Sequence, residues 1–147
     1  DLGVDVDQVP GAGAAGGMGA AMLAVLQGQL RPGCEIIAHA VGLHQAVQGA
    51  DLVITGEGRI DQQTIFGKTP FGVATVARQH GVPVVGIAGS LGHNAHVVHA
   101  HGIHAIFSVL SRPCNILEAV AEAAFNVRSS ARNIAAMLAL GQGLGKH

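Results

Sequence analysis

The chain has 147 residues, 49% of them hydrophobic, which is enough for one domain with a substantial core. Eight Lys and Arg side chains stand against nine Asp and Glu, and the net charge of −1 excludes the basic surface that proteins use to bind nucleic acid or an anionic membrane. Only two cysteines occur, and the apolar run at 20–26 is too short to span a bilayer, so we expect a soluble protein of the reducing cytoplasm.

The first expected helix follows a glycine-rich segment, PGAGAAGGMG at 10–19, and ends near Gln29, ahead of the Arg-Pro-Gly at 31–33. Glycines at this spacing allow successive backbone N–H groups to converge on an anion beside the positive end of a helix. However, no Lys-Ser or Lys-Thr follows as in a P-loop, and no clear strand precedes as in a dinucleotide-binding fingerprint. A hinge that packs small residues against a neighbour is therefore the competing interpretation.

The middle of the chain predicts a strand, a helix and a second strand. Two short helical segments come first, between 34 and 49, although the first of them could equally form a strand. Apolar runs at 51–55 (DLVIT) and 83–88 (PVVGIA) then predict buried strands, and residues 70–80 between them have helical spacing. The expected N-cap, first residue and terminating glycine of that helix are Thr69, Pro70 and Gly81.

The pattern repeats once more, with a helix near 93–101, a strand at 104–109 and a long terminal helix. Asn115, with Glu118 three residues later, resembles a capping box at the start of that helix. Its apolar side chains recur at three- or four-residue steps, at Leu117, Val120, Ala124, Val127, Ala131, Ile134 and Leu138. We expect this amphipathic helix to cover one face of a sheet.

Strands that alternate with helices predict an α/β fold with a parallel sheet and flanking helices. Ligands bind beyond the carboxyl ends of parallel strands. In this chain those ends are the segments TGEGR (55–59), GSLG (89–92) and SVLSRP (108–113). Because three strands make a thin sheet, we expect the rest of the sheet to come from chain that is not present here.

The segment TGEGRIDQQTIFGK at 55–68 gathers charged residues in a chain that has few of them. Its charged side chains are those of Glu57, Arg59, Asp61 and Lys68. Gly56 and Gly58 are expected to turn the backbone off the strand and so to place these charges at its carboxyl end. There, arginine and lysine can bind a carboxylate or phosphate, and a carboxylate can accept a proton or hold Mg²⁺. A solvated loop with internal ion pairs is the less favoured interpretation.

Two further segments carry weaker signals. The GSLG segment can wrap a phosphate or a ribose with its backbone N–H groups, and it can equally be an ordinary turn. Histidines at 93, 96 and 99 follow one another at three-residue steps, but no Cys, Asp or Glu joins them. We therefore expect a solvated helix face rather than a native metal site.

Taken in order, PGAGAAGGMGAAM, LRPG, ADLVITGEGRIDQQTIFGKTPFGVA and GVPVVGIAGSLG resemble the bacterial glycerate kinases that phosphorylate glycerate at the 2-position. The resemblance extends from about Pro10 into the terminal helix, and GEGRID with the following QT and GK is its most specific part. The chains of that family are longer, and their N-terminal half carries a Lys-containing strand and an ADGGEGT-like segment that do not occur here. The resemblance therefore implies a C-terminal portion that supplies part of a site, and we do not expect this chain alone to be active.

The resemblance implies ATP-dependent transfer of the γ-phosphoryl group to D-glycerate, which gives 2-phosphoglycerate, with Mg²⁺ assisting. It also implies half of a Rossmann-like layered domain at 49–147 and, at 1–48, the tail of a second, inserted α/β domain. On this pattern the catalytic residues are Glu57, Arg59 and Asp61, and which carboxylate acts as base or metal ligand stays open. The expected substrate- or phosphate-binding residues are Gly11, Gly13, Gly16, Gly17, Gln63, Thr64, Lys68, Gly89 and Ser90.

The competing function is a non-catalytic α/β module that binds a nucleotide or a small acid. An open sheet edge and an uncovered apolar surface predict association with the missing N-terminal half or with a second copy of the chain. No nucleic acid or membrane is expected among the partners.

Overall fold

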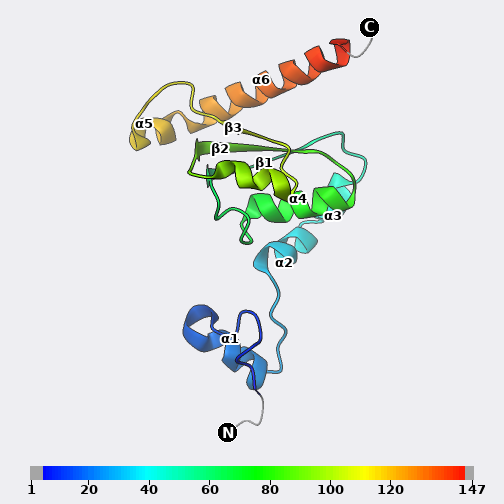
Figure 1. The fold of residues 1–147 in the computed structure, drawn as a ribbon, viewed down its shortest axis with the longest axis vertical. Coiled ribbons are helices and arrows are strands. Elements are labelled where there is room, and N and C mark those ends of the chain that lie inside the picture. Colours follow the sequence, from blue (N-terminus) through cyan, green and yellow to red (C-terminus); the bar gives the residue numbers. More distant parts are fainter. Residues whose placement is uncertain (1–4, 145–147) are drawn as a thin grey trace.

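The computed structural model describes residues 5–144, and its centre is a parallel sheet of three strands (Figure 1). The strands are β1 (Val53–Ile60), β2 (Val84–Leu91) and β3 (Ala105–Ser108). They lie in the spatial order β1-β2-β3, with Val53 opposite Val84 and Val85 opposite Ala105. The expected α/β fold with a parallel sheet is confirmed.

β1 is longer than the sequence predicts. The expected turn at Gly56 and Gly58 is wrong, because β1 includes both glycines and Glu57 lies opposite Ala88 of β2. A Cβ atom added at Gly56 would lie 2.5 Å from the backbone oxygen of Ile87. Glycine at this position therefore allows two strands to approach each other closely, rather than turning the chain.

β2 also continues past its expected end. It includes Gly89 and Ser90, so the alternative of an ordinary turn over GSLG is wrong and only Gly92 follows the strand. A Cβ atom at Gly89 would lie 2.7 Å from the backbone oxygen of Gly58 in the neighbouring strand. The N–H of Gly92 donates a hydrogen bond of 2.7 Å to the backbone oxygen of Ile60. The carboxyl ends of β1 and β2 therefore lie side by side and are joined by a hydrogen bond.

One face of the sheet is covered by α4 (Thr69–Gln79) and by the 3₁₀-helix η1 (Ala95–His101). The helices expected at 70–80 and near 93–101 are confirmed, the second as a 3₁₀-helix. α4 begins one residue early: Lys68 occupies the N-cap position, while Thr69 and Pro70 lie in the first turn. Gly81, with φ of 69°, follows the end of the helix as expected.

The packed core lies between this face of the sheet and its helices. Ala74 of α4, Val84 of β2, Val98 of η1 and Ile103 before β3 belong to it, and each is at most 1% exposed. These side chains come from the helical and strand patterns that the sequence shows most clearly. Because Ile60 at the end of β1 also belongs to this core, the core determines the position of β1 and of the segment that follows it.

Two short helices, α2 (Gly33–Ala40) and α3 (Leu43–Val47), pack beside α4. The alternative of a strand in this part of the chain is wrong. A Cβ atom added at Gly72 of α4 would lie 2.9 Å from the Cβ atom of Cys34 in α2. Glycine at 72 therefore allows α2 to lie close to α4, which places α2 next to the segment that ends β1.

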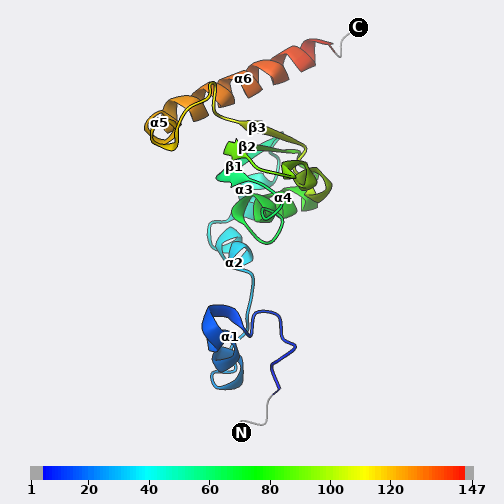
Figure 2. The same ribbon diagram turned by 60° about the vertical axis from the view of Figure 1, so that its left-hand side comes forward.

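The opposite face of the sheet carries α5 (Ile116–Ala121) and α6 (Ala123–Leu144), as Figures 1 and 2 both show. The expected N-cap is confirmed, because the Asn115 side chain accepts a hydrogen bond of 3.0 Å from the Glu118 N–H. The return bond of the capping box differs, since the Glu118 carboxylate accepts from the Asn115 side-chain amide at 2.8 Å. The expected single helix is instead two helices that meet at Glu122, and α6 covers only part of the sheet. Of its expected apolar stripe Ile134 is buried, whereas Leu138 is half exposed.

An ion pair network fixes the start of α5. Arg112 donates hydrogen bonds of 2.9 Å to the carboxylates of Glu118 and Glu122. The hydrogen bond that Arg112 donates to Glu118, followed by the one it donates to Glu122, raises the pKa of the Arg112 guanidinium above its ordinary value. All three side chains are well exposed, so this network orients the helix ends more than it stabilises the core.

The N-terminal helix α1 (Ala14–Ala24) lies apart from the sheet, beyond α2 and the irregular segment 27–32 (Figures 1 and 2). It ends at Ala24, earlier than the expected end near Gln29. Gln27, which lies between these two positions, has a left-handed backbone conformation. Its first turn is interrupted by left-handed backbone at 15–17. Residues 1–4 and 145–147 of the two expected domains lie outside the described residues. Over residues 5–144, no helix has the length and apolarity that crossing a bilayer requires.

Candidate active site

The charged residues of the GEGRID segment gather at the carboxyl end of β1. The Nζ atom of Lys68 lies 3.8 Å from Oε2 of Glu57 and 3.7 Å from Oδ1 of Asp61. The Nε atom of Arg59 lies 3.4 Å from Oδ2 of Asp61. We call these four side chains the charged cluster. β1 supplies Glu57 and Arg59, the turn after β1 supplies Asp61, and Lys68 stands at the start of α4.

Burial divides the charged cluster into an inner and an outer part. The carboxylate side chains of Glu57 and Asp61 are 17% and 19% exposed, whereas Lys68 is 37% and Arg59 62% exposed. The carboxylates are therefore held in place, and the two cations face solvent at the edge of the cluster. Cations in this position can meet an incoming anion without first being uncovered.

Thr64 lies beneath the charged cluster and is fully buried. Its hydroxyl donates a hydrogen bond of 2.6 Å to Oε1 of Glu57 and accepts one of 3.1 Å from the N–H of Asp61. The neighbouring Gln63 N–H donates to Oδ1 of Asp61 at 2.9 Å. The turn after β1 thus orients both carboxylates through short bonds, and the Thr64 side chain faces these residues instead of solvent.

A glycine that the sequence analysis did not single out completes this arrangement. A Cβ atom at Gly92 would lie 2.7 Å from Nε of Arg59 and 2.8 Å from Cβ of Asp61. Any larger residue would therefore push against the cluster. The sequence shows Gly92 as the last residue of GSLG, directly after β2. The spacing of residues does not show that Gly92 lies against Arg59 and Asp61 from the neighbouring strand and the turn after it.

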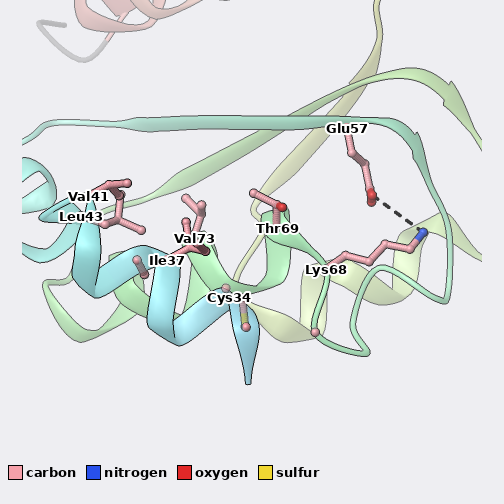
Figure 3. A pocket seen from close by; sticks show the side chains of 12 residues that line it. Cys34, Ile37, Val41, Leu43, Glu57, Lys68, Thr69 and Val73 are labelled. Atoms are coloured by element: carbon pink, nitrogen blue, oxygen red, sulfur yellow. Dashed lines mark ion pairs between the residues drawn. The ribbon is translucent and has the colours of Figure 1, made fainter. Parts of the chain in front are cut away.

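A pocket of about 490 Å³ opens beside the cluster, between α2 and α4 (Figure 3). Glu57 and Lys68 lie together at one end of it, joined by their ion pair, and Thr69 stands next to them. Its other walls are apolar and come from Cys34, Ile37, Val41, Leu43 and Val73. We call this the lysine pocket. The contribution of α2 was missed by the sequence analysis, since it depends on how α2 packs against α4.

A second cavity, of about 420 Å³, lies on the other face of the sheet, between the strand ends and α5 and α6. Gly89 and Ser90 line it together with Gly58 and Glu57. The structure thus brings Gly89 and Ser90 to the same strand ends as the charged cluster. We call this the apolar cavity, because most of its walls are aliphatic side chains.

The glycine-rich segment is not brought to the cluster. Gly11, Gly16 and Gly17 have positive φ angles and lie in or before the first turn of α1, as does Gly13. In Figures 1 and 2 α1 is separated from the sheet by α2 and the segment 27–32. None of these glycines lines the lysine pocket or the apolar cavity. Their expected role in phosphate binding stays a prediction.

The histidine series lies on η1 and the turn before it, where His93, His96 and His99 are exposed. A ring nitrogen of His99 lies 2.8 Å from the backbone oxygen of Ile103. The expected solvated helix face is confirmed. Within the described part of the chain, no three His, Cys, Asp or Glu side chains are grouped as a metal site would require.

The model of the glycerate kinase family matches residues 1–139. The glycerate 2-kinase of Escherichia coli is 54% identical over 140 residues, which are 95% of this chain and 37% of that protein. The glycerate kinase of Halalkalibacterium halodurans is 52% identical, over 92% of this chain and 36% of that protein.

A solved structure agrees with these matches. The crystal structure described as glycerate kinase 2 from Salmonella typhimurium is 52% identical and superposes with a TM-score of 0.74, over 97% of this chain and 36% of that one. The chain thus spans little more than a third of the length of the relatives it matches. With its family model, its relatives and its fold in agreement, this chain belongs to the glycerate kinase family.

Proposed function

We propose that this chain supplies part of the active site of an ATP-dependent kinase that phosphorylates the 2-hydroxyl group of D-glycerate and forms 2-phosphoglycerate. The observation that carries the proposal is the charged cluster, in which Lys68 stands between Glu57 and Asp61 at the carboxyl end of a parallel strand. Ligands bind at that end of such sheets. The cluster occurs in a chain that belongs to the glycerate kinase family, which supports this reaction over other phosphoryl transfers.

In this proposal the lysine pocket receives D-glycerate. Lys68 lies at its charged end and can attract the carboxylate of the acid, while the aliphatic walls exclude water from the carbon chain. Glu57 lines the same pocket, and among residues 5–144 its Oε2 atom is engaged only by the long 3.8 Å contact to Lys68. That oxygen is our candidate acceptor for the proton of the 2-hydroxyl group as the phosphoryl group arrives.

Asp61 and Arg59 have a different role in the proposal. Both oxygens of Asp61 already contact cations or an N–H group, so we assign Asp61 to holding Arg59 and Lys68 in place. Arg59, the most exposed member, can neutralise the phosphoryl group during transfer. Thr64 orients Glu57 from below through its hydroxyl group.

Nucleotide kinases use Mg²⁺, which binds through one or two carboxylates together with substrate phosphates and water. The charged cluster offers carboxylates of this kind, and Asp61, which the proposal does not use as the proton acceptor, would hold the ion beside its contacts with Arg59 and Lys68. When bound, Mg²⁺ neutralises charge on the phosphates. Lys68 already balances both carboxylates, so the cluster stays partly neutralised without the ion.

We further propose that residues 49–147 are the C-terminal half of a Rossmann-like domain and that residues 1–48 are the end of a second, inserted domain. The separation of α1 from the sheet supports this division. Gly11, Gly13, Gly16 and Gly17 would then offer backbone donors from across a cleft, and the remaining chain of the family, or a second copy, would cover the exposed apolar helices. The two unpaired cysteines, Cys34 and Cys114, support a location in the reducing cytoplasm.

The test of the proposed function is Glu57→Gln in an enzyme of full family length that contains this segment. Glutamine keeps the shape of the side chain but cannot accept the proton, so we expect kcat to fall by about 100-fold or more. The product is followed with ATP and D-glycerate by ³¹P NMR, which also identifies the 2-phosphate ester. Glu122→Gln, in an exposed carboxylate between α5 and α6, is the matched control and should keep the original rate. An unchanged kcat for Glu57→Gln would remove this residue from the mechanism. If the parent enzyme bound ATP and D-glycerate but transferred no phosphoryl group, the result would support a non-catalytic module instead.

A further inference from the structure

The apolar cavity lies on the face of the sheet opposite the lysine pocket, and the two meet at Glu57, which lines both. Its floor is formed at the carboxyl ends of β1 and β2, and its roof by α5 and the start of α6. The floor includes Gly58 and Gly89, which lie in neighbouring strands and carry no side chains. Two adjacent glycines give a flat stretch of backbone that a planar ring can approach closely.

The lining of the apolar cavity disfavours glycerate as its occupant. Its side walls are aliphatic, with contributions from Val109, Ile116, Val120 and Val127. None of its lining residues is Lys or Arg, whereas Lys68 stands in the lysine pocket. A small organic anion would lose its hydration here without gaining a cation. An aromatic, uncharged group of larger size fits such walls.

Building on the proposed function, we propose that the apolar cavity receives the purine base and ribose of the nucleotide donor. The base stacks on the Gly58–Gly89 floor between aliphatic walls, and the exposed hydroxyl of Ser90 offers a polar contact to the ribose or to the edge of the base. The phosphates then extend toward Glu57 and the charged cluster, where the acceptor arrives from the other face. Donor and acceptor thereby approach one reacting centre from opposite sides of the sheet.

The two cysteines of the chain report on the two sites separately. Cys114 lines the apolar cavity and Cys34 lines the lysine pocket, and both are half-buried free thiols. The rate at which iodoacetamide alkylates each one can be followed by mass spectrometry of the same sample. A ligand at about ten times its Kd should slow alkylation of the cysteine that it covers by about tenfold.

The first experiment therefore uses the unmodified chain with adenosine, ATP and D-glycerate as probes. We expect adenosine and ATP to protect Cys114 and to leave Cys34 unchanged, while D-glycerate does not protect Cys114. Alkylation of Cys114 at an unchanged rate in saturating adenosine would overturn the proposal without any variant. Protection of both cysteines by adenosine to the same degree would also overturn it, since it would indicate a general change in the chain.

The second experiment fills the cavity. A Cβ atom at Gly58 would meet no heavy atom within 4 Å, so Gly58→Val should fold and project its side chain into open space. We expect the concentration of adenosine that protects Cys114 to rise about tenfold or more, with the melting temperature retained. Gly141→Val adds the same bulk on α6, where a Cβ atom also has free space, and should leave protection unchanged. Equal protection in Gly58→Val and the parent chain would contradict the assignment.

These results separate the nucleotide site from the proposed function. If a full-length enzyme phosphorylates glycerate while adenosine leaves Cys114 unprotected, the kinase activity stands and the base is bound elsewhere. If adenosine protects Cys114 but no glycerate is phosphorylated, the nucleotide site stands and the proposed reaction is wrong.

Discussion

The face of the sheet that carries α4 and η1 is closely packed, whereas the face that carries α5 and α6 leaves most apolar side chains of these helices exposed. On the first face, Ala74, Val84 and Val98 are fully buried. On the second, Leu117 and Leu140 are 79% and 63% exposed although both belong to regular helices. Both faces carry helices with apolar side chains. Within residues 5–144, only the helices on the first face pack most of these side chains against the sheet.

The comparison shows where a local pattern is sufficient and where it is not. A helical repeat of apolar residues predicts that a helix will be buried, but it does not say against what. The relatives are far longer than this chain, which spans 36% to 37% of them. Contacts from the remaining chain of the family are therefore our explanation for the exposed apolar side chains of α5 and α6 that do not line the apolar cavity, such as Leu117 and Leu140.

The largest expected effect on stability comes from the packed face. Ile103→Ala removes a side chain that is 1% exposed and leaves a cavity, so we expect the free energy of unfolding to fall by about 2–5 kcal/mol. Leu140→Ala on α6 is the matched change on the other face and should cost no more than about 0.5 kcal/mol. Urea unfolding of both variants measures the difference. Equal losses would mean that α6 is packed in solution and that the two faces do not differ.

The close contact of β1 and β2 gives the next effect. Gly56→Ala places a Cβ atom 2.5 Å from the backbone oxygen of Ile87, so the strands must move apart, at a cost of about 1–3 kcal/mol. Gly58→Ala, two residues along the same strand, meets no atom within 4 Å and serves as its control. Thermal unfolding of both proteins checks this prediction. Should Gly56→Ala melt at the temperature of the parent chain, the two strands would not be as close as described.

The smallest effect concerns the start of α5. Asn115→Ala removes the oxygen that accepts from the Glu118 N–H, and loss of such a cap costs about 1 kcal/mol. Asn133→Ala, at an exposed position within α6, removes no cap and should leave stability unchanged or slightly raised. The comparison is made by denaturant titration under identical conditions. A cost for Asn133→Ala as large as that for Asn115→Ala would argue against the cap.

Much of the fold could be predicted from the sequence, because its strongest signals are local. The apolar runs that became β1 and β2 and the helical spacing of α4 were sufficient for a parallel α/β sheet. The glycines in β1 misled the prediction, since Gly56 allows the close approach of Ile87 in the neighbouring strand and does not form a turn. The break at Glu122 had no signal in the apolar repeat, which continues through it.

The candidate site also has a part that could be predicted from a local segment and a part that could not. Glu57, Arg59, Asp61 and Lys68 come from one short segment, so their proximity could be predicted from that segment alone. The wall provided by α2, the closeness of Gly92 and the apolar cavity depend on packing between distant segments, which residue spacing does not reveal. The roles of these residues in binding and catalysis stay predictions until they are measured.

The central claim is that the charged cluster acts on a phosphoryl group or on its acceptor, and Lys68→Met tests it most directly. Methionine keeps much of the length and removes the charge, so kcat/KM for D-glycerate should fall by about 100-fold or more in an enzyme of full family length that contains this segment. Arg78→Met removes an exposed cation from the end of α4 and is the matched control, with no expected change. A kcat/KM for Lys68→Met equal to that of Arg78→Met and of the parent enzyme would contradict the account.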